Sequence, residues 1–140
     1  MLLVRTFEAL RSELALAPAV VELLPGGVYL FQAPAGTRES YAVMRPADAG
    51  GETAWTTAGL AIETVPIAIE LLGLAGFERA NAAGDAVCDR LDRVPDLVVA
   101  GQKATTLRRS AYPAIRPVER ENLYAVRVDY VLKITRKIGA

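Results

Sequence analysis

The chain has 140 residues, 52% apolar and 23% charged, which predicts one globular domain over residues 1–140. It has no histidine and a single cysteine, Cys88. This composition excludes His-based nucleophile pairs, imidazole acid/base chemistry, His-ligated metals and intramolecular disulfides. We therefore expect no enzyme activity, no catalytic residue, no metal and no cofactor.

The charge balances overall but not along the chain. Sixteen basic and sixteen acidic residues give zero net charge, yet residues 1–70 hold four basic and eight acidic side chains while residues 71–140 hold twelve and eight. A balanced total does not suit a free nucleic-acid binder. An acidic half and a basic end suit head-to-tail self-association, and ordinary scatter of surface charge is the alternative.

Neither an export signal nor a membrane span is expected. Arg5 directly follows a short apolar start, and the apolar run 60–77 is interrupted by Glu63, Pro66 and Glu70. We expect a cytosolic protein.

A helix is predicted over residues 2–17, with Pro18 at its end and one further helical turn over 19–24. Its apolar positions recur at spacings of four, three and four; they are Leu3, Phe7, Leu10 and Leu14.

Two short strands, 28–31 and 40–45, follow, and then a connection of low structural content over residues 46–59. This segment is predicted to be a mobile loop and carries the only tryptophan, Trp55. Trp55 either packs back on the domain or anchors a partner.

A long strand is predicted over residues 60–72, where apolar residues alternate. Pro66 lacks a backbone donor, so this strand is expected at a sheet edge or to be bulged there.

The second helix is predicted over residues 77–94. Gly84 lies on its apolar side, and its lack of a side chain indicates close approach to the sheet. Cys88 is expected to be a small buried residue. The opposite side carries an acidic stripe at spacings of four, three and four; its members are Asp85, Asp89, Asp92 and Asp96.

At the end of the chain, residues 97–99 are predicted to be a short strand or a turn, and 105–115 a strand. After a polar connection over 117–122 a final strand is predicted over 124–134. In this last strand apolar and polar residues alternate without a break, as in an antiparallel strand with one buried face. The order of elements predicts an α+β fold, one antiparallel sheet with two helices packed on one face.

Two groups of side chains are candidates for function. The acidic stripe is a solvated surface, a set of hard metal ligands, or a channel lining that repels passing DNA. The basic end favours contacts with a neighbouring subunit over direct nucleic-acid binding. The expected partner interface comprises Trp55, Arg108, Arg109, Arg127, Asp129 and Lys133.

The chain resembles the tail terminator, or tail completion, family of long-tailed phages and related gene-transfer particles. The resemblance rests on the leading helix, the Gly26-Gly27-Val28-Tyr29 strand entry, the strand Tyr41-Ala42-Val43, the threonine-containing loop, the strand through Pro66-Ile67-Ala68-Ile69, the helix 77–94 and the closing strand 124–134. It covers nearly the whole chain as a pattern of architecture.

The resemblance implies a structural role without catalysis. Such proteins form rings, commonly hexamers, that cap the tail tube and present a surface to the head-side connector, or stopper. DNA passes through the ring. The protein would assemble in the host cytoplasm and then belong to the virion.

Two other classes of function stay open from the residues alone. One is a small α+β ligand-binding or regulatory module with a pocket between sheet and helices. The other is an accessory subunit of an enzyme. A ring predicts a mass several times 15.0 kDa, whereas a ligand module predicts a monomer or dimer stabilised by a metabolite.

Overall fold

A computed structural model describes residues 2–47, 52–55, 59–92, 94, 96–118 and 122–137. Within these ranges there are three helices, α1 (Leu2–Ala15), α2 (Pro18–Leu23) and α3 (Phe77–Leu91). The strands in the same ranges are β1 (Val28–Leu30), β2 (Tyr41–Pro46), β3 (Glu52–Trp55), β4 (Leu60–Ala75), β5 (Val98–Val99), β6 (Gln102–Arg108), β7 (Ala114–Val118) and β8 (Leu123–Lys137).

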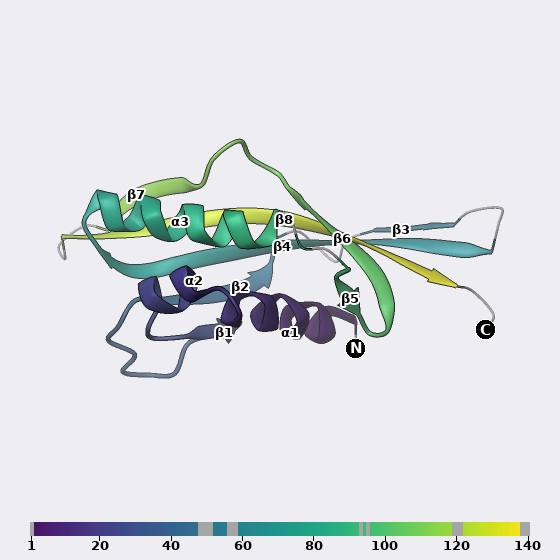
Figure 1. The fold of residues 1–140 in the computed structure, drawn as a ribbon, viewed down its shortest axis with the longest axis horizontal. Helices are drawn as coiled ribbons and strands as arrows, with labels where there is room; N and C mark the ends of the chain where they lie inside the picture. The colour runs from purple at the N-terminus through teal and green to yellow at the C-terminus, as the bar shows by residue number, and fades with distance from the viewer. Residues whose placement is uncertain are drawn as a thin grey trace.

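The α+β class is confirmed, but the sheet is larger and more mixed than predicted. Its strands lie in the order β1-β2-β4-β8-β6-β5, with β3 paired to β4 and β7 paired to β8. The expected purely antiparallel sheet is corrected at one place, because β1 runs parallel to β2. The helices lie together over one part of the sheet in Figure 1.

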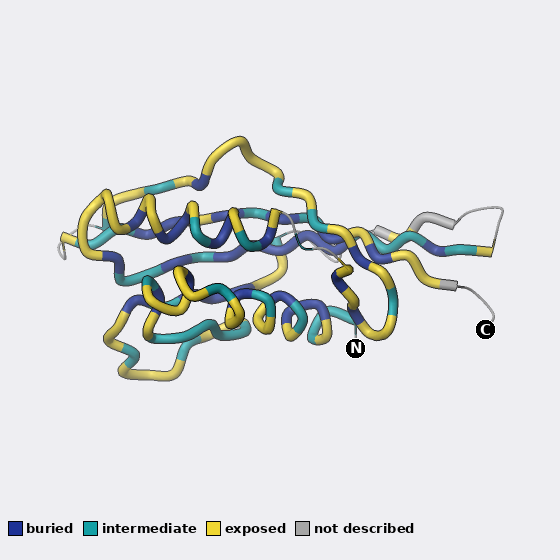
Figure 2. Tube along the Cα trace, in the orientation of Figure 1, coloured by how far each residue is buried: buried dark blue, intermediate teal, exposed yellow. Residues whose placement is uncertain are grey.

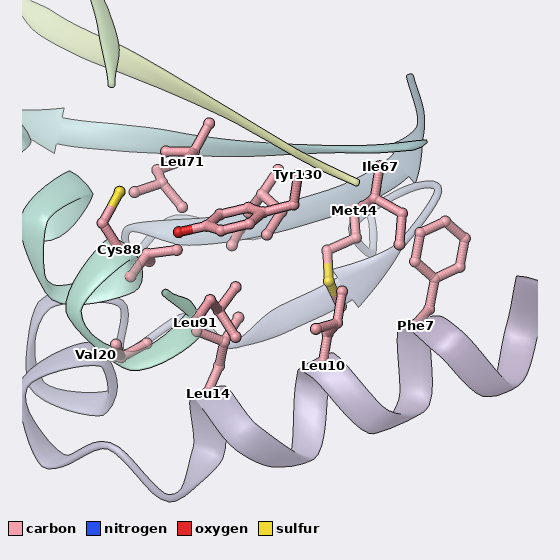
Figure 3. Close-up of a cluster of buried hydrophobic side chains, with 14 of the residues drawn as sticks. Phe7, Leu10, Leu14, Val20, Met44, Ile67, Leu71, Cys88, Leu91 and Tyr130 are labelled. Atoms are coloured by element: carbon pink, nitrogen blue, oxygen red, sulfur yellow. The ribbon is translucent and has the colours of Figure 1, made fainter. Parts of the chain in front are cut away.

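Strands β4 and β8 form the centre of the sheet through a long antiparallel ladder. Their alternate residues point to opposite faces. The cross-strand partners Ile67 and Tyr130 are fully buried beneath the helices. In Figure 3, Phe7, Leu10 and Leu14 of α1 point toward this layer. The buried side chains of α1 and α3 therefore form the core that joins helices to sheet; they include Phe7, Leu10, Leu14, Ala80, Val87 and Leu91.

Pro66 lies in the central strand β4, neither at a sheet edge nor at a bulge as predicted, since the register between β4 and β8 is continuous there. Its carbonyl accepts a hydrogen bond from the Ala47 N–H. Pro66 thus faces the place where β2 has ended at Pro46 and β3 pairs only as far as Thr64. The N and C=O of one strand residue point to the same side. The N–H that Pro66 lacks is therefore missing at the gap between β2 and β3, where neither strand pairs with it.

The segment 46–59 is not a structureless loop. Residues 52–55 form β3, which pairs antiparallel with Ala61–Thr64 of β4; the rest of the expected loop, 48–51 and 56–58, lies outside the described residues. Figures 1 and 2 show β3, the first part of β4 and the end of β8 projecting beyond the helices. We call these strand segments the arm.

The predicted strand 105–115 is two strands. β6 ends at Arg108, and β7 begins at Ala114 after a series of bends. The predicted close approach at Gly84 is confirmed: an added Cβ there would lie 3.0 Å from Pro113 Cγ and 3.2 Å from Val126 Cγ1.

Candidate assembly surfaces

The face of the sheet opposite the helices carries charged side chains, and we call it the open face. On it Arg45 of β2 lies 3.4 Å from Glu70 of β4, and Arg127 Nε donates to Asp129 Oδ1 at 2.9 Å. Glu70 and Arg127 are direct cross-strand partners. The charges therefore alternate across three strands.

Basic residues outnumber acidic ones on the open face. Lys133 pairs in register with Thr64 and lies exposed on this side of β8. Arg116 of β7 is also exposed and stands opposite Ala125. In contrast, the acidic Glu70 and Asp129 of this face already contact arginines. The open face thus presents surplus positive charge.

The predicted partner interface is only partly one surface. Arg127, Asp129 and Lys133 share the open face, because they are spaced by two along β8. Arg109 follows the end of β6, where its backbone N–H donates to the Asp129 carbonyl at 3.0 Å. Trp55 is the last residue of β3 in the arm.

Arg108 does not belong to the open face. It pairs with Tyr130 across β6 and β8, on the side covered by helices, and its guanidinium lies 3.4 Å from Asp92 Oδ2. This ion pair joins β6 to the end of α3. No local pattern predicts this contact, because Arg108 and Asp92 belong to different elements that are separated along the chain.

Asp92 is part of a half-buried polar cluster. The Tyr130 hydroxyl donates to Asp92 Oδ1 at 2.7 Å, and Cys88 lies beside both Tyr130 and Arg108. Burial, and then the contact with Asp92, raises the pKa of Tyr130 above its usual value. Burial also raises the pKa of the Cys88 thiol, which favours the unreactive protonated form. The prediction that Cys88 is buried is confirmed.

The acidic stripe is shorter than the sequence predicted. Helix α3 ends at Leu91, so Asp92 is its C-cap and Asp96 lies in a later turn with φ of 55°. Only Asp85 and Asp89 stay exposed on the helix itself. Glu78, in the first turn, extends this exposed acidic side.

Hollows lie at the margins of the sheet. A groove of about 410 Å³ runs beside the arm, with Ile62, Thr105 and Lys133 among its lining residues. Another, of about 310 Å³, lies between β2 and the turn that follows Phe31. The described residues contain no group of His, Cys, Asp or Glu side chains that could hold a metal ion. Among the helices that can be described, none is long and apolar enough to cross a membrane.

Sequence reasoning missed β3 and the arm. Thr53 and Trp55 are residue types that favour strands, but the adjacent Gly50 and Gly51 indicated a loop. β3 is four residues long, too short for an alternation pattern to be distinctive. Its pairing with β4 was the missing information.

Comparison with known proteins shows a likeness of fold to a solved structure. No protein-family model matches the chain, and no curated protein matches it. A solved chain from the "Virion of native gene transfer agent (GTA) particle" superposes with a TM-score of 0.74 at 22% identity. The match covers 91% of this chain and 92% of that chain. The two chains therefore share a fold over nearly their whole lengths.

Proposed function

We propose that this chain is a structural protein of a phage-like or gene-transfer particle, and within it a ring-forming tail terminator. It would cap the tail tube, join it to the head-side connector, and act without catalysis. The observation that carries the proposal is the full-length fold likeness to a chain of a gene transfer agent virion. The agreement with the predicted architecture, from leading helix to closing strand, supports the finer role.

The distribution of charge supports self-association. A ring is built from heterologous contacts, in which two different patches meet. The open face holds surplus positive charge at Lys133 and Arg116, while the helices of the acidic first half carry the exposed Glu8 and Glu22. Charges of opposite sign steer the approach of neighbouring copies.

The lumen of the ring needs a surface that DNA does not bind. Carboxylates repel the phosphate backbone, and Asp85 and Asp89 are exposed, so they stay candidates for this lining. Asp92 is a weaker one, since its carboxylate already contacts Tyr130 and Arg108. DNA is then a molecule in transit, and the partners are further copies, the tail tube and the connector.

Electron microscopy of the purified protein, alone and mixed with tail tubes, tests this function. We expect ring-shaped particles, or density capping one end of each tube, and sedimentation at several times the 15.0 kDa of one chain. A protein that stays monomeric in both conditions and leaves tube ends bare would overturn the proposal. Assembly occurs in the host cytoplasm in this scheme, and the finished ring belongs to the virion.

A charge-reversal pair tests whether the open face takes part. Lys133→Glu reverses an exposed charge on that face, and Arg5→Glu makes the same change on exposed α1. We expect Lys133→Glu to weaken self-association in sedimentation while Arg5→Glu leaves it unchanged. Equal effects would show that net charge, and not the open face, controls assembly.

A further inference from the structure

Two strands of the sheet have backbone edges without a strand partner among the described residues. β3 pairs with β4 on one side. β6 pairs with β8 over Ala104–Arg108, but on its other side β5 and the preceding Leu97 cover it only as far as Ala104. Such edges present N–H and C=O groups that can pair with another strand.

The direction of the backbone groups on β3 follows from the alternation along β4. The Pro66 carbonyl points to the side of β2 and β3, because it accepts from Ala47 N–H. Ile62, four residues earlier, points the same way and is the register partner of Ala54. Ala54 therefore faces β4, and its neighbours Thr53 and Trp55 direct their backbone groups outward.

The same reasoning fixes the outward residues of β6. Ala104 N–H donates to Leu97 O, away from β8, whereas Arg109 N–H donates to Asp129 O, toward β8. Even-numbered positions of β6 therefore face outward. Beyond the short β5, the outward residues are Thr106 and Arg108.

The strand directions fit a head-to-tail junction. β4 runs antiparallel to β3 and β8, and β6 runs antiparallel to β8, so β3 and β6 point in opposite directions. In a ring whose strands run along its axis, rotation about that axis keeps the strand sense from copy to copy. The outer edge of β6 in one copy would then meet β3 of the next in the antiparallel sense, which is the more stable pairing.

The side chains also suit pairing at these edges. Proteins protect free edges with proline, as β7 does with Pro117, but β3 and the outer part of β6 contain none. Leu107 is 59% exposed on β6. An exposed apolar residue on an edge strand is typical of an association surface.

We propose that β3 of one copy adds to the outer edge of β6 in the next copy, so that one sheet continues from subunit to subunit. This inference rests on the proposed ring function and names the surfaces that meet. The partner that binds each edge is a second copy of this chain, because the chain itself supplies both complementary edges. With only two outward residues on each edge, the junction is short and depends on ring closure or on the tail tube.

The variants Thr53→Pro and Thr53→Ala test the junction. Proline removes the outward N–H of β3 and is tolerated at an edge position that does not donate inward. Alanine removes the side chain but keeps the N–H, so it is the matched control. We expect Thr53→Ala to assemble like the parent, alone or on tail tubes, and Thr53→Pro to lose the ring while keeping the parent circular dichroism spectrum.

Hydrogen exchange of the unmodified protein gives an independent reading. On assembly, the amides of Thr53, Trp55, Thr106 and Arg108 should exchange at least tenfold more slowly. The amide of Ala54, which already faces β4, should not change. This measurement decides the question even if Thr53→Pro fails to fold.

The outcomes separate the inference from the function. If Thr53→Pro still forms rings, or the four amides stay unprotected in rings, edge pairing is wrong and the ring function stands. If the protein stops at two copies, the edges pair with themselves and the inference is wrong. If the parent chain assembles neither alone nor on tubes, the proposed function fails and the inference fails with it.

Discussion

The two faces of the sheet come from the same strands but differ in what covers them. On the covered face, Ile67 and Tyr130 are fully buried under the helices; one residue further along, Ala68 lies opposite Asp129 on the open face. Burial of apolar area drives folding, and here the covered face supplies most of it. The open face is therefore available for charge and for contacts with other molecules.

The largest expected effect tests this division directly. Phe7 is fully buried against the covered face, whereas Leu107 is 59% exposed on the open one. Phe7→Ala should lower the free energy of unfolding by about 3–5 kcal/mol through lost burial and a cavity. Leu107→Ala should change it by less than about 0.5 kcal/mol. Urea unfolding of both variants measures the contrast, and similar losses would show that the open face is part of the core.

A smaller effect sharpens how tightly the covered face is packed. Gly84→Leu would force a side chain between α3, Pro113 and Val126, so we expect overpacking to cost about 1–3 kcal/mol. Ala82→Leu, at an exposed position of the same helix, is the control and should be close to neutral. A stable Gly84→Leu variant would indicate that the helix can move away from the sheet.

Most of the covered face could be predicted from the sequence. The alternation of β8 and the stripe of α1 express the local periods of strand and helix, and both carry a clear apolar pattern. The end of α3 was predicted three residues late, because the apolar Val94 follows Leu91 at a helical spacing of three. Local pattern thus predicted the elements and missed a boundary.

The open face and the arm depend on pairings between distant residues. The parallel alignment of β1 with β2 and the short strand β3 have no local signature. Arg108 was expected at an interface, but its position in register with Tyr130 turns it toward Asp92. The distribution of charge therefore predicted which half of the chain is basic, but it did not predict which face each basic side chain occupies.

The polar cluster beneath α3 should contribute a still smaller amount. Tyr130→Phe removes the hydrogen bond to Asp92 and, because that carboxylate is partly exposed and keeps Arg108, should cost about 1 kcal/mol at neutral pH. Chemical denaturation near pH 7 measures the loss. An unchanged stability would show that water replaces the bond.

The difference in stability between the parent and Tyr130→Phe should change with pH, and the raised pKa of Tyr130 sets its sign. Burial raises the pKa of Tyr130 in the folded state above the ordinary value of 10.0. Below pH 10 the phenol is protonated in both the folded and the unfolded protein, so the hydrogen bond contributes fully to stability. Above pH 10 the phenol ionises first in the unfolded protein, and the free energy of unfolding falls. The gap between parent and Tyr130→Phe should therefore narrow above about pH 10. A gap that widens there would contradict the raised pKa.

The smallest effect concerns the turn between β5 and β6, which closes the covered face at Val99 and leads into the edge of β6. Ala100 and Gly101 both have positive φ, 51° and 78°, as in the two-residue hairpin turn that prefers Asn-Gly. Alanine is strained there because its Cβ crowds the carbonyl. Ala100→Asn should therefore raise the free energy of unfolding by about 0.5–1 kcal/mol and Tm by roughly 2–4 °C. Val98→Asn, at an exposed position of β5 where φ is not positive, should give no such gain.

If assembly depends on the outer edge of β6, Ala100→Asn should also strengthen self-association slightly, because the hairpin that leads into this edge is more rigid. A variant that is more stable as a monomer but assembles less well would show that assembly requires the hairpin to move.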